Sequence, residues 1–155
     1  MRTRVLLAED DEDHAFFTVR AFRDMHGVGV EMQTVRDGAE LLDFLHQRGE
    51  YADAQRPHLI LLDLKMPMVS GLEALSVIKE CASLRSIPVV VLSSSDRPED
   101  VADSYASGAN SYVTKSASLS GLREGVQELA KYWIDVSALP TGGPEPQRSA
   151  GAQQG

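Results

Sequence analysis

The sequence predicts an α/β fold in which five parallel strands form one doubly wound sheet with helices on both faces. Short runs of β-branched and apolar residues alternate five times with segments whose apolar residues recur every three or four positions. The runs are apolar almost throughout, which is typical of parallel strands that are covered on both sides. Repeated strand–helix units of this kind indicate a parallel sheet.

The first two strands are expected at Arg4–Ala8 and Val30–Val35. The second run alternates Val, Met and Thr with Glu and Gln, a period of two that suits a strand. The helix after each strand is marked by an apolar stripe, which is Phe16, Val19 and Phe22 after the first and Leu41, Leu42 and Leu45 after the second.

The remaining strands are expected at His58–Leu62, Pro88–Leu92 and Ser111–Val113. The run Pro-Val-Val-Val-Leu is the most apolar, so it predicts the most deeply buried strand. The helical stripes that follow are Leu72, Leu75, Ile78 and Ala82, then Val101, Ala102 and Tyr105, and finally Leu119, Leu122, Val126, Leu129 and Trp133.

Length and composition indicate one domain. The chain has 155 residues, of which 43% are hydrophobic, and we expect a domain over residues 1–136. Residues 137–155 are rich in Pro, Gly, Gln and Ser, which predicts a largely disordered C-terminal extension.

Charge and cysteine content exclude several classes. A formal net charge of −8 argues against a nucleic-acid module and against docking on an anionic membrane. No apolar run is long enough to span a bilayer, and Glu9 and Asp10 come too early for a signal peptide. Cys81 is the only cysteine, so no internal disulfide is expected. These features predict a cytoplasmic protein.

Polar residues follow four of the predicted strands. Glu9, Asp10 and Asp11 follow the first strand, Asp63 the third, Ser93–Ser95 the fourth, and Lys115 the fifth. Ligands of doubly wound sheets bind outside the carboxyl ends of the strands, so we expect these groups to meet there.

The chemistry of such a cluster suits phosphoryl transfer. Clustered carboxylates repel one another, and a hard cation such as Mg²⁺ relieves this cost through its preference for oxygen ligands. A carboxylate such as Asp63 can also act as a nucleophile and form an acyl phosphate. Lys115 and Ser93 would supply donors for the phosphoryl oxygens.

Four stretches of the sequence, in order, resemble the receiver domain of response regulators from two-component signalling. The acidic pair after the first strand, the Met-Pro loop that closes on Gly, the strand that ends in a hydroxyl, and the Gly-Ala segment that leads to Lys carry the resemblance. They are Val5–Asp11, Leu61–Gly71, Pro88–Ser94 and Gly108–Lys115, and the resemblance extends from Arg2 to Ile134.

The resemblance implies a flavodoxin-like (βα)5 fold with strand order 2-1-3-4-5 and a phosphoacceptor site. In that case Glu9, Asp10, Asp63 and the backbone carbonyl of Lys65 bind Mg²⁺. Asp63 also accepts the phosphoryl group from the phosphohistidine of a histidine kinase, and Lys115 holds the phosphate. Ser93 and Tyr112 form the switch. Output is expected by protein contact or onward phosphotransfer, as in a single-domain response regulator.

One departure from the family affects the lysine. Ser116 stands where the family usually has proline, whose cis bond often aims the preceding lysine. The sequence therefore leaves the backbone geometry of Lys115 open. Serine rather than threonine at position 93 keeps the hydroxyl.

The C-terminal part resembles single-domain receivers that partner bacterial phytochrome-type histidine kinases. The resemblance lies in the segment Tyr132–Val136 and its Pro-containing extension. It implies a homodimer through the last helix and the extension. Tyr132, Ile134 and Leu139 would add more apolar surface than a helix leaving a small sheet can easily cover.

Other readings compete with these. The chain could be a phosphorylation-independent interaction module with a receiver fold, or a Mg²⁺-dependent phosphohydrolase. The latter needs a second acid two residues after the nucleophile, where Lys65 stands. Asp11 could simply cap a helix, Ser93 could cap a turn, and Lys115 could be solvated. The four histidines have no metal-binding spacing and are expected to be surface or structural groups, and Cys81 a packing residue.

Overall fold

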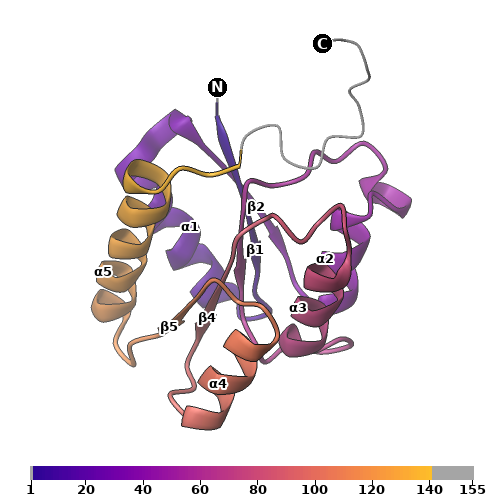
Figure 1. The fold of residues 1–155 in the computed structure, drawn as a ribbon. Helices are drawn as coiled ribbons and strands as arrows, with labels where there is room; N and C mark the ends of the chain where they lie inside the picture. Colours follow the sequence, from indigo (N-terminus) through magenta and orange to yellow (C-terminus); the bar gives the residue numbers. More distant parts are fainter. Residues whose placement is uncertain (1, 141–155) are drawn as a thin grey trace.

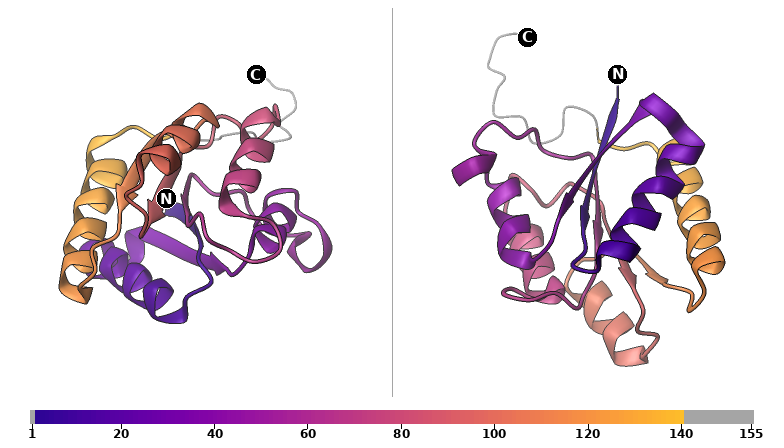
Figure 2. Two further views of the ribbon diagram at one scale, coloured as in Figure 1. Left: turned by 90° about the horizontal axis from the view of Figure 1, so that it is seen from below. Right: turned by 180° about the vertical axis from the view of Figure 1, so that it is seen from behind.

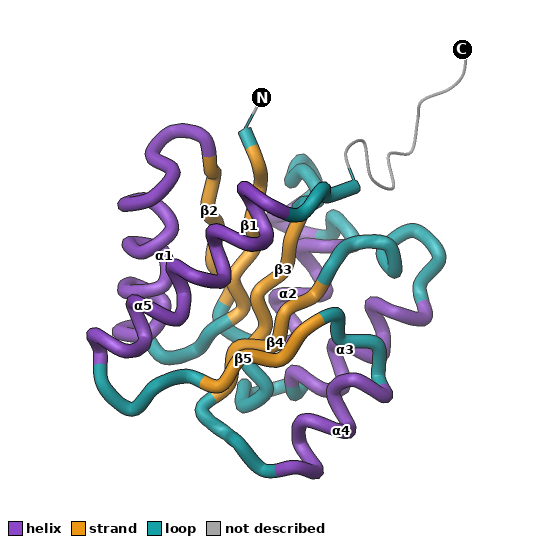
Figure 3. The backbone as a smooth tube through the Cα atoms, turned by 60° about the vertical axis from the view of Figure 1, so that its left-hand side comes forward, coloured by secondary structure: helices purple, strands orange, loops and turns teal. Residues whose placement is uncertain are grey.

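The computed structural model describes residues 2–140 and contains one parallel five-stranded sheet in the order β2-β1-β3-β4-β5 (Figure 1). The strands lie side by side in that order in Figure 3. Their bounds are Thr3–Ala8 for β1, Val30–Val35 for β2, Leu59–Leu62 for β3, Val89–Ser93 for β4 and Ser111–Thr114 for β5. The predicted fold class and strand order are therefore confirmed. Residues 141–155 of the predicted tail lie outside the described residues.

Five helices cover the two faces of the sheet (Figure 2). Helices α1 and α5 lie on one face, and α2 and α3 lie on the other. Their bounds are Glu12–His26 for α1, Gly38–Leu45 for α2, Gly71–Glu80 for α3, Pro98–Ala106 for α4 and Leu119–Ala130 for α5. Short 3-10 turns at Gly27–Gly29 and Gly49–Tyr51 follow α1 and α2, and a π-helical segment, Lys131–Val136, continues α5.

Side chains at the helix starts explain where most helices begin. The N-cap side chain of four helices accepts a hydrogen bond from a backbone N–H of the first turn, which replaces a missing intrahelical partner. These N-caps are Asp11, Asp37, Ser70 and Ser118. At α3 the side chain of Glu73 also accepts from the Ser70 N–H, completing a capping box. Helix α4 instead begins with a proline, Pro98, whose fixed φ suits the first turn.

The core has two layers, one on each face of the sheet. Successive residues of a strand contribute to opposite layers, and all four residues of β3 are buried. The strands therefore read as continuous apolar runs because both of their faces are covered. The layer under α2 and α3 includes Leu6, Ile60, Leu62, Val89 and Val91, and the layer under α1 and α5 includes Val5, Leu7, Leu59, Leu61 and Val90.

Several stripe residues do not lie where the sequence predicts. Phe16 is 57% exposed because α1 faces the sheet with Thr18, Ala21 and Phe22. Leu119 and Tyr105 are about half exposed, at 51% and 49%. In α4 the residue that is buried is Ser104, so its apolar stripe does not mark its packed face. Ala82 is exposed because α3 ends at Glu80.

The end of the last helix changes its winding. After Ala130 the backbone continues as the π-helix Lys131–Val136, and the Ser137 N–H donates to the Tyr132 carbonyl at 2.6 Å. The wider turn changes the direction of the following side chains. Trp133, Ile134 and Leu139 pack against the core layer under α1 and α5. The prediction of additional exposed apolar surface is therefore wrong for Ile134 and Leu139, which are partly buried, and confirmed for Tyr132, which is 52% exposed.

Among residues 2–140, no helix combines the length and the apolar character that crossing a bilayer requires.

The ammonium of Lys79 joins three chain segments at the end of the sheet where β4 and β5 begin. Its Nζ donates to the carbonyls of Arg85 and Ile87 at 3.0 and 2.8 Å, and to Oδ1 of Asn110 at 3.1 Å. Its stem packs closely against Gly108, where an added Cβ would lie 2.6 Å from Cγ. Lys79 therefore ties the turn after α3 to the turn before β5.

We expect Lys79→Met to lower the free energy of unfolding by about 2 kcal/mol, because the acceptors lose charged donors while the stem remains. Urea unfolding followed by circular dichroism measures this change. Lys131→Met, at an exposed lysine, is the control. A loss below about 0.5 kcal/mol for Lys79→Met would contradict the structural role.

Candidate functional site

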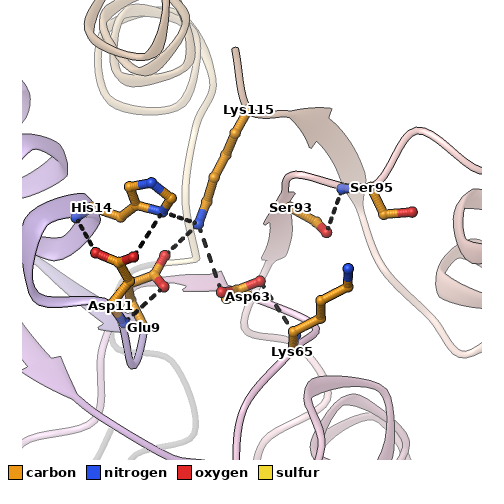
Figure 4. Close-up of polar contacts among 8 residues, drawn as sticks. All are labelled: Glu9, Asp11, His14, Asp63, Lys65, Ser93, Ser95 and Lys115. Carbon is orange, nitrogen blue, oxygen red and sulfur yellow. Dashed lines mark hydrogen bonds and ion pairs between the residues drawn. The ribbon is translucent and has the colours of Figure 1, made fainter. Parts of the chain in front are cut away.

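The carboxyl ends of β1, β3, β4 and β5 bring together the polar residues that the sequence singles out (Figure 4). The backbone ladder continues one residue past two of these strands. The Glu9 N–H donates to the Val35 carbonyl at 2.9 Å, and the Asp63 N–H donates to the Ala8 carbonyl at 3.0 Å. These bonds fix the backbone of both acids at the rim of the sheet.

Three carboxylates form an acidic cluster there. One oxygen from each of Glu9, Asp10 and Asp63 lies within 4.8 Å of the others. Glu9 and Asp63 are buried, and Asp10 is exposed. Hard oxygen donors at this spacing, with one side open to solvent, suit a divalent cation such as Mg²⁺ that keeps part of its hydration shell. The donor set therefore fits a cation of this class.

Lys115 supplies the positive charge beside the cluster. Its Nζ lies 2.6 Å from Glu9 Oε1 and 3.6 Å from Asp63 Oδ2. The backbone N–H of Lys115 donates to the Ser93 carbonyl at 2.7 Å. This bond extends the β4–β5 pairing and places the Lys115 side chain at the rim of the sheet. The ammonium is buried, so solvent screens these interactions weakly.

The electrostatics of Glu9 reflect its surroundings. Burial raises the pKa of Glu9 to about 7, the Lys115 hydrogen bond opposes this rise, and the nearby Asp63 charge adds to it. The second carboxylate oxygen accepts from the Asp11 N–H at 3.2 Å. Glu9 is therefore harder to ionise than an ordinary glutamate, and a cation bound in the cluster would oppose this effect.

The loop between β3 and α3 holds Asp63 through close backbone packing. A Cβ on Gly71 would lie 2.2 Å from the Asp63 carbonyl oxygen, so only glycine lets α3 begin so near the acid. Gly38 at the start of α2 leaves similar room for the Val69 carbonyl, which a Cβ would approach to 1.9 Å. The Lys65 N–H donates to Asp63 Oδ1 at 3.3 Å, while the Lys65 side chain is exposed.

Ser95 connects the predicted switch residues. The Ser93 side chain is fully buried, and its Oγ accepts from the Ser95 N–H at 3.2 Å. Tyr112 donates from its hydroxyl to the Ser95 carbonyl at 2.8 Å, and Ser95 Oγ donates to Asp100 Oδ2 at 2.5 Å. The Tyr112 N–H in turn donates to the Tyr105 hydroxyl at 3.1 Å. One buried serine thus joins the end of β4, the first turn of α4 and β5.

The segment around Ser116 orders itself without proline. All peptide bonds between residues 2 and 140 are trans. Ser116 Oγ accepts from the Ser118 N–H at 3.3 Å, and Ser118 caps α5. A Cβ on Gly121 would lie 2.2 Å from Ser116 Oγ, so the hydroxyl packs against the first turn of that helix. Lys115 therefore reaches Glu9 from a trans backbone.

Two features of the site have no clear signal in the sequence. Nδ1 of His14, in the first turn of α1, lies 3.0 Å from Lys115 Nζ, and the Ser95–Asp100 pair joins the β4–α4 loop. Asp11 itself is the N-cap of α1, as its alternative reading proposes.

A cavity of about 370 Å³ opens beside the acidic cluster between α1 and the end of β2. Glu9 and Asp10 line one part of it, and Phe16, Val19 and Arg36 line another. The exposed ring of Phe16 thus lines the same cavity as Glu9 and Asp10.

Comparison with known proteins places this geometry in one family. Residues 5–127 match the family described as "Response regulator receiver domain". The curated response regulator Rcp1 from Synechocystis sp. is 38% identical over 136 residues, which cover 88% of this chain and 92% of Rcp1.

Solved structures agree. The structure of the phosphorylated cyanobacterial phytochrome response regulator RcpA is 41% identical in sequence and has a TM-score of 0.88. The match covers 91% of this chain and 100% of the RcpA chain. The Mn²⁺-bound form of Rcp1 is 38% identical with a TM-score of 0.85, covering 89% of this chain and 99% of that chain. The chain belongs to the response regulator receiver domain family of two-component signalling.

Proposed function

We propose that Asp63 accepts a phosphoryl group from the phosphohistidine of a sensor histidine kinase, with Mg²⁺ bound by Glu9, Asp10, Asp63 and the Lys65 carbonyl. The observation that carries this proposal is the position of Asp63, buried between two further carboxylates and the Lys115 ammonium. The solved Mn²⁺-bound form of Rcp1 supports a divalent cation in this family.

The side chains at the rim have distinct roles in this transfer. A carboxylate oxygen of Asp63 forms the new P–O bond as the P–N bond of phosphohistidine breaks and the imidazole nitrogen regains its electron pair. Lys115 and the Ser93 hydroxyl donate to the phosphoryl oxygens. Mg²⁺, when bound, neutralises charge on these oxygens and on the acidic cluster.

The signal would leave the site through Ser95. The Ser93 hydroxyl accepts a hydrogen bond from the Ser95 N–H. When the hydroxyl turns toward a phosphoryl group, this hydrogen bond changes and the Ser95 backbone shifts with it. Tyr112 and Asp100 are bound to the same serine, so β5 and α4 respond together. Output then follows by protein contact or by onward phosphotransfer. In this role the chain is a signalling protein that catalyses only its own phosphorylation and dephosphorylation.

The kinase partner is proposed to be of the bacterial phytochrome type. Rcp1 and the phytochrome response regulator RcpA support this proposal, because each matches nearly the full described chain. No observation favours the alternative of a phosphorylation-independent interaction module, and the acidic cluster with its lysine argues against it.

We also propose a homodimer through the last helix and the extension. The apolar surface available for it is smaller than the sequence predicts. Trp133 and Ile134 pack within the chain, whereas Tyr132 and Val136 are 52% and 66% exposed. These two residues, on the π-helical segment, are exposed apolar side chains that a second copy could cover.

Intact mass after incubation with acetyl phosphate and Mg²⁺ tests the acceptor. Wild type is expected to gain one phosphoryl mass, and Asp63→Asn none, because the amide cannot form the acyl phosphate. Asp96→Asn, at an exposed aspartate near the site, should gain it as wild type does. Equal gain by Asp63→Asn would overturn the proposed role of Asp63.

Calorimetric titration tests the cation site through its pH dependence. Protonation of Glu9, whose pKa lies at about 7, competes with the cation. Apparent Mg²⁺ affinity should therefore rise about tenfold from pH 6 to pH 8. Without metal, the free energy of unfolding depends on pH in the opposite direction. Folding raises the pKa of Glu9 from 4.5 to about 7, so the stability that protonated Glu9 contributes at low pH is lost as the pH rises through 7. Glu9→Gln should remove the dependence of affinity on pH, and an unchanged dependence in that variant would contradict the assignment.

Sedimentation velocity tests the dimer. Wild type is expected to sediment as a dimer and Val136→Asp as a monomer, because a charge on the exposed π-helical segment opposes apolar contact. Val77→Asp, at a valine that is 40% exposed on α3, is the matched control and should remain dimeric. A monomeric wild type at all concentrations would remove the dimer proposal.

A further inference from the structure

The ammonium of Lys115 has three N–H donors, and three groups surround it. Nζ lies 2.6 Å from Glu9 Oε1, 3.0 Å from His14 Nδ1 and 3.6 Å from Asp63 Oδ2. The side chain is 4% exposed, so water has little access to replace a lost partner. Two of the donors are therefore hydrogen-bonded, to Glu9 and to His14, and the Asp63 carboxylate lies at ion-pair distance from the same ammonium.

The His14 contact defines the state of the imidazole. An ammonium can only donate, so Nδ1 of His14 must accept with its lone pair, and the ring proton must lie on Nε2. The backbone N–H of His14 donates to Asp11 Oδ1 at 3.0 Å as part of the helix cap, which fixes the backbone from which the ring projects. Asp11 Oδ2 also lies near the ring, 4.0 Å from Nδ1.

We infer that His14 is a positioning residue for Lys115. By accepting one N–H, it holds the ammonium between Glu9 and Asp63 and leaves one donor directed at the side of Asp63 where a phosphoryl oxygen would lie. The inference rests on the proposed phosphoacceptor function and deepens it, because it assigns the aim of the lysine to a residue of α1. Figure 4 shows the ring, the ammonium and the two carboxylates around this point.

Loss of the His14 acceptor has a predictable consequence. A freed donor would turn toward the nearest remaining oxygens, and Asp63 Oδ2 is already 3.6 Å away. A closer Lys115–Asp63 pair would stabilise the carboxylate in its unreacted form and so lower its reactivity as a nucleophile. Asp63 would still be able to accept a phosphoryl group, but it would react more slowly.

Two substitutions distinguish this role from a general effect on folding. Asn at position 14 places its side-chain oxygen near the position of Nδ1, whereas Gln places it one bond further out, near the position of Nε2. Both are neutral amides of similar chemistry, so they form a matched pair. Only His14→Asn can restore the acceptor that Lys115 needs.

The experiment follows the initial rate of phosphoryl gain from acetyl phosphate with Mg²⁺ by intact mass. His14→Gln is expected to react about tenfold more slowly than wild type, the effect of one lost hydrogen bond to a charged group. His14→Asn should stay within about twofold of wild type. Thermal unfolding of both variants checks that they fold equally well.

Equal rates for wild type and both variants, or equal slowing in both variants, would overturn the role of His14 while leaving the phosphoacceptor function standing. A wild type that gains no phosphoryl group would overturn the proposed function itself. A long-range ¹H–¹⁵N spectrum of the imidazole provides a check that needs no phosphorylation. An unprotonated Nδ1 on His14 supports the contact, and a proton on Nδ1 overturns it.

Discussion

The buried ammonium of Lys115 between Glu9 and Asp63 is the interaction on which the rest of the site depends. It joins β5 to β1 and β3 across 106 residues of sequence separation from Glu9. The three carboxylates of Glu9, Asp10 and Asp63 lie together beside this ammonium. Burying charged pairs contributes little net stability, because desolvation offsets the attraction. Folding alone therefore explains the arrangement poorly, and the arrangement agrees with the proposed binding of a cation and a phosphoryl group.

The fold supplies the geometry through a few close approaches. Gly71 lets α3 begin against the backbone of Asp63, and the β4–β5 pairing extends to the Lys115 N–H. On the other side, Ser95 connects the Ser93 hydroxyl to Tyr112 and to α4. A shift of the Ser93 hydroxyl would therefore affect Tyr112 and α4, and this is the route that we propose from the site to protein contact.

Much of this architecture is predictable from the sequence. Buried parallel strands must be apolar on both faces, so their runs are visible, and the rim residues follow because the carboxyl ends of such strands lie together. His14 is not predictable in the same way, because a lone histidine carries no pattern and its role depends on the rotation of α1. The same rotation leaves Phe16 exposed, and the π-helical turn covers Trp133 and Ile134. Periodicity indicates that a helix has an apolar face but does not fix the phase of its packing.

A crystal structure with Mg²⁺ and beryllofluoride, a phosphoryl mimic, would test the central claim most directly. The account predicts the mimic on a carboxylate oxygen of Asp63 and the cation among Glu9, Asp10 and Asp63. It also predicts one N–H of Lys115 donating to a fluoride while His14 still accepts another. A mimic bound elsewhere, or a Lys115 ammonium that points away from it, would contradict the account.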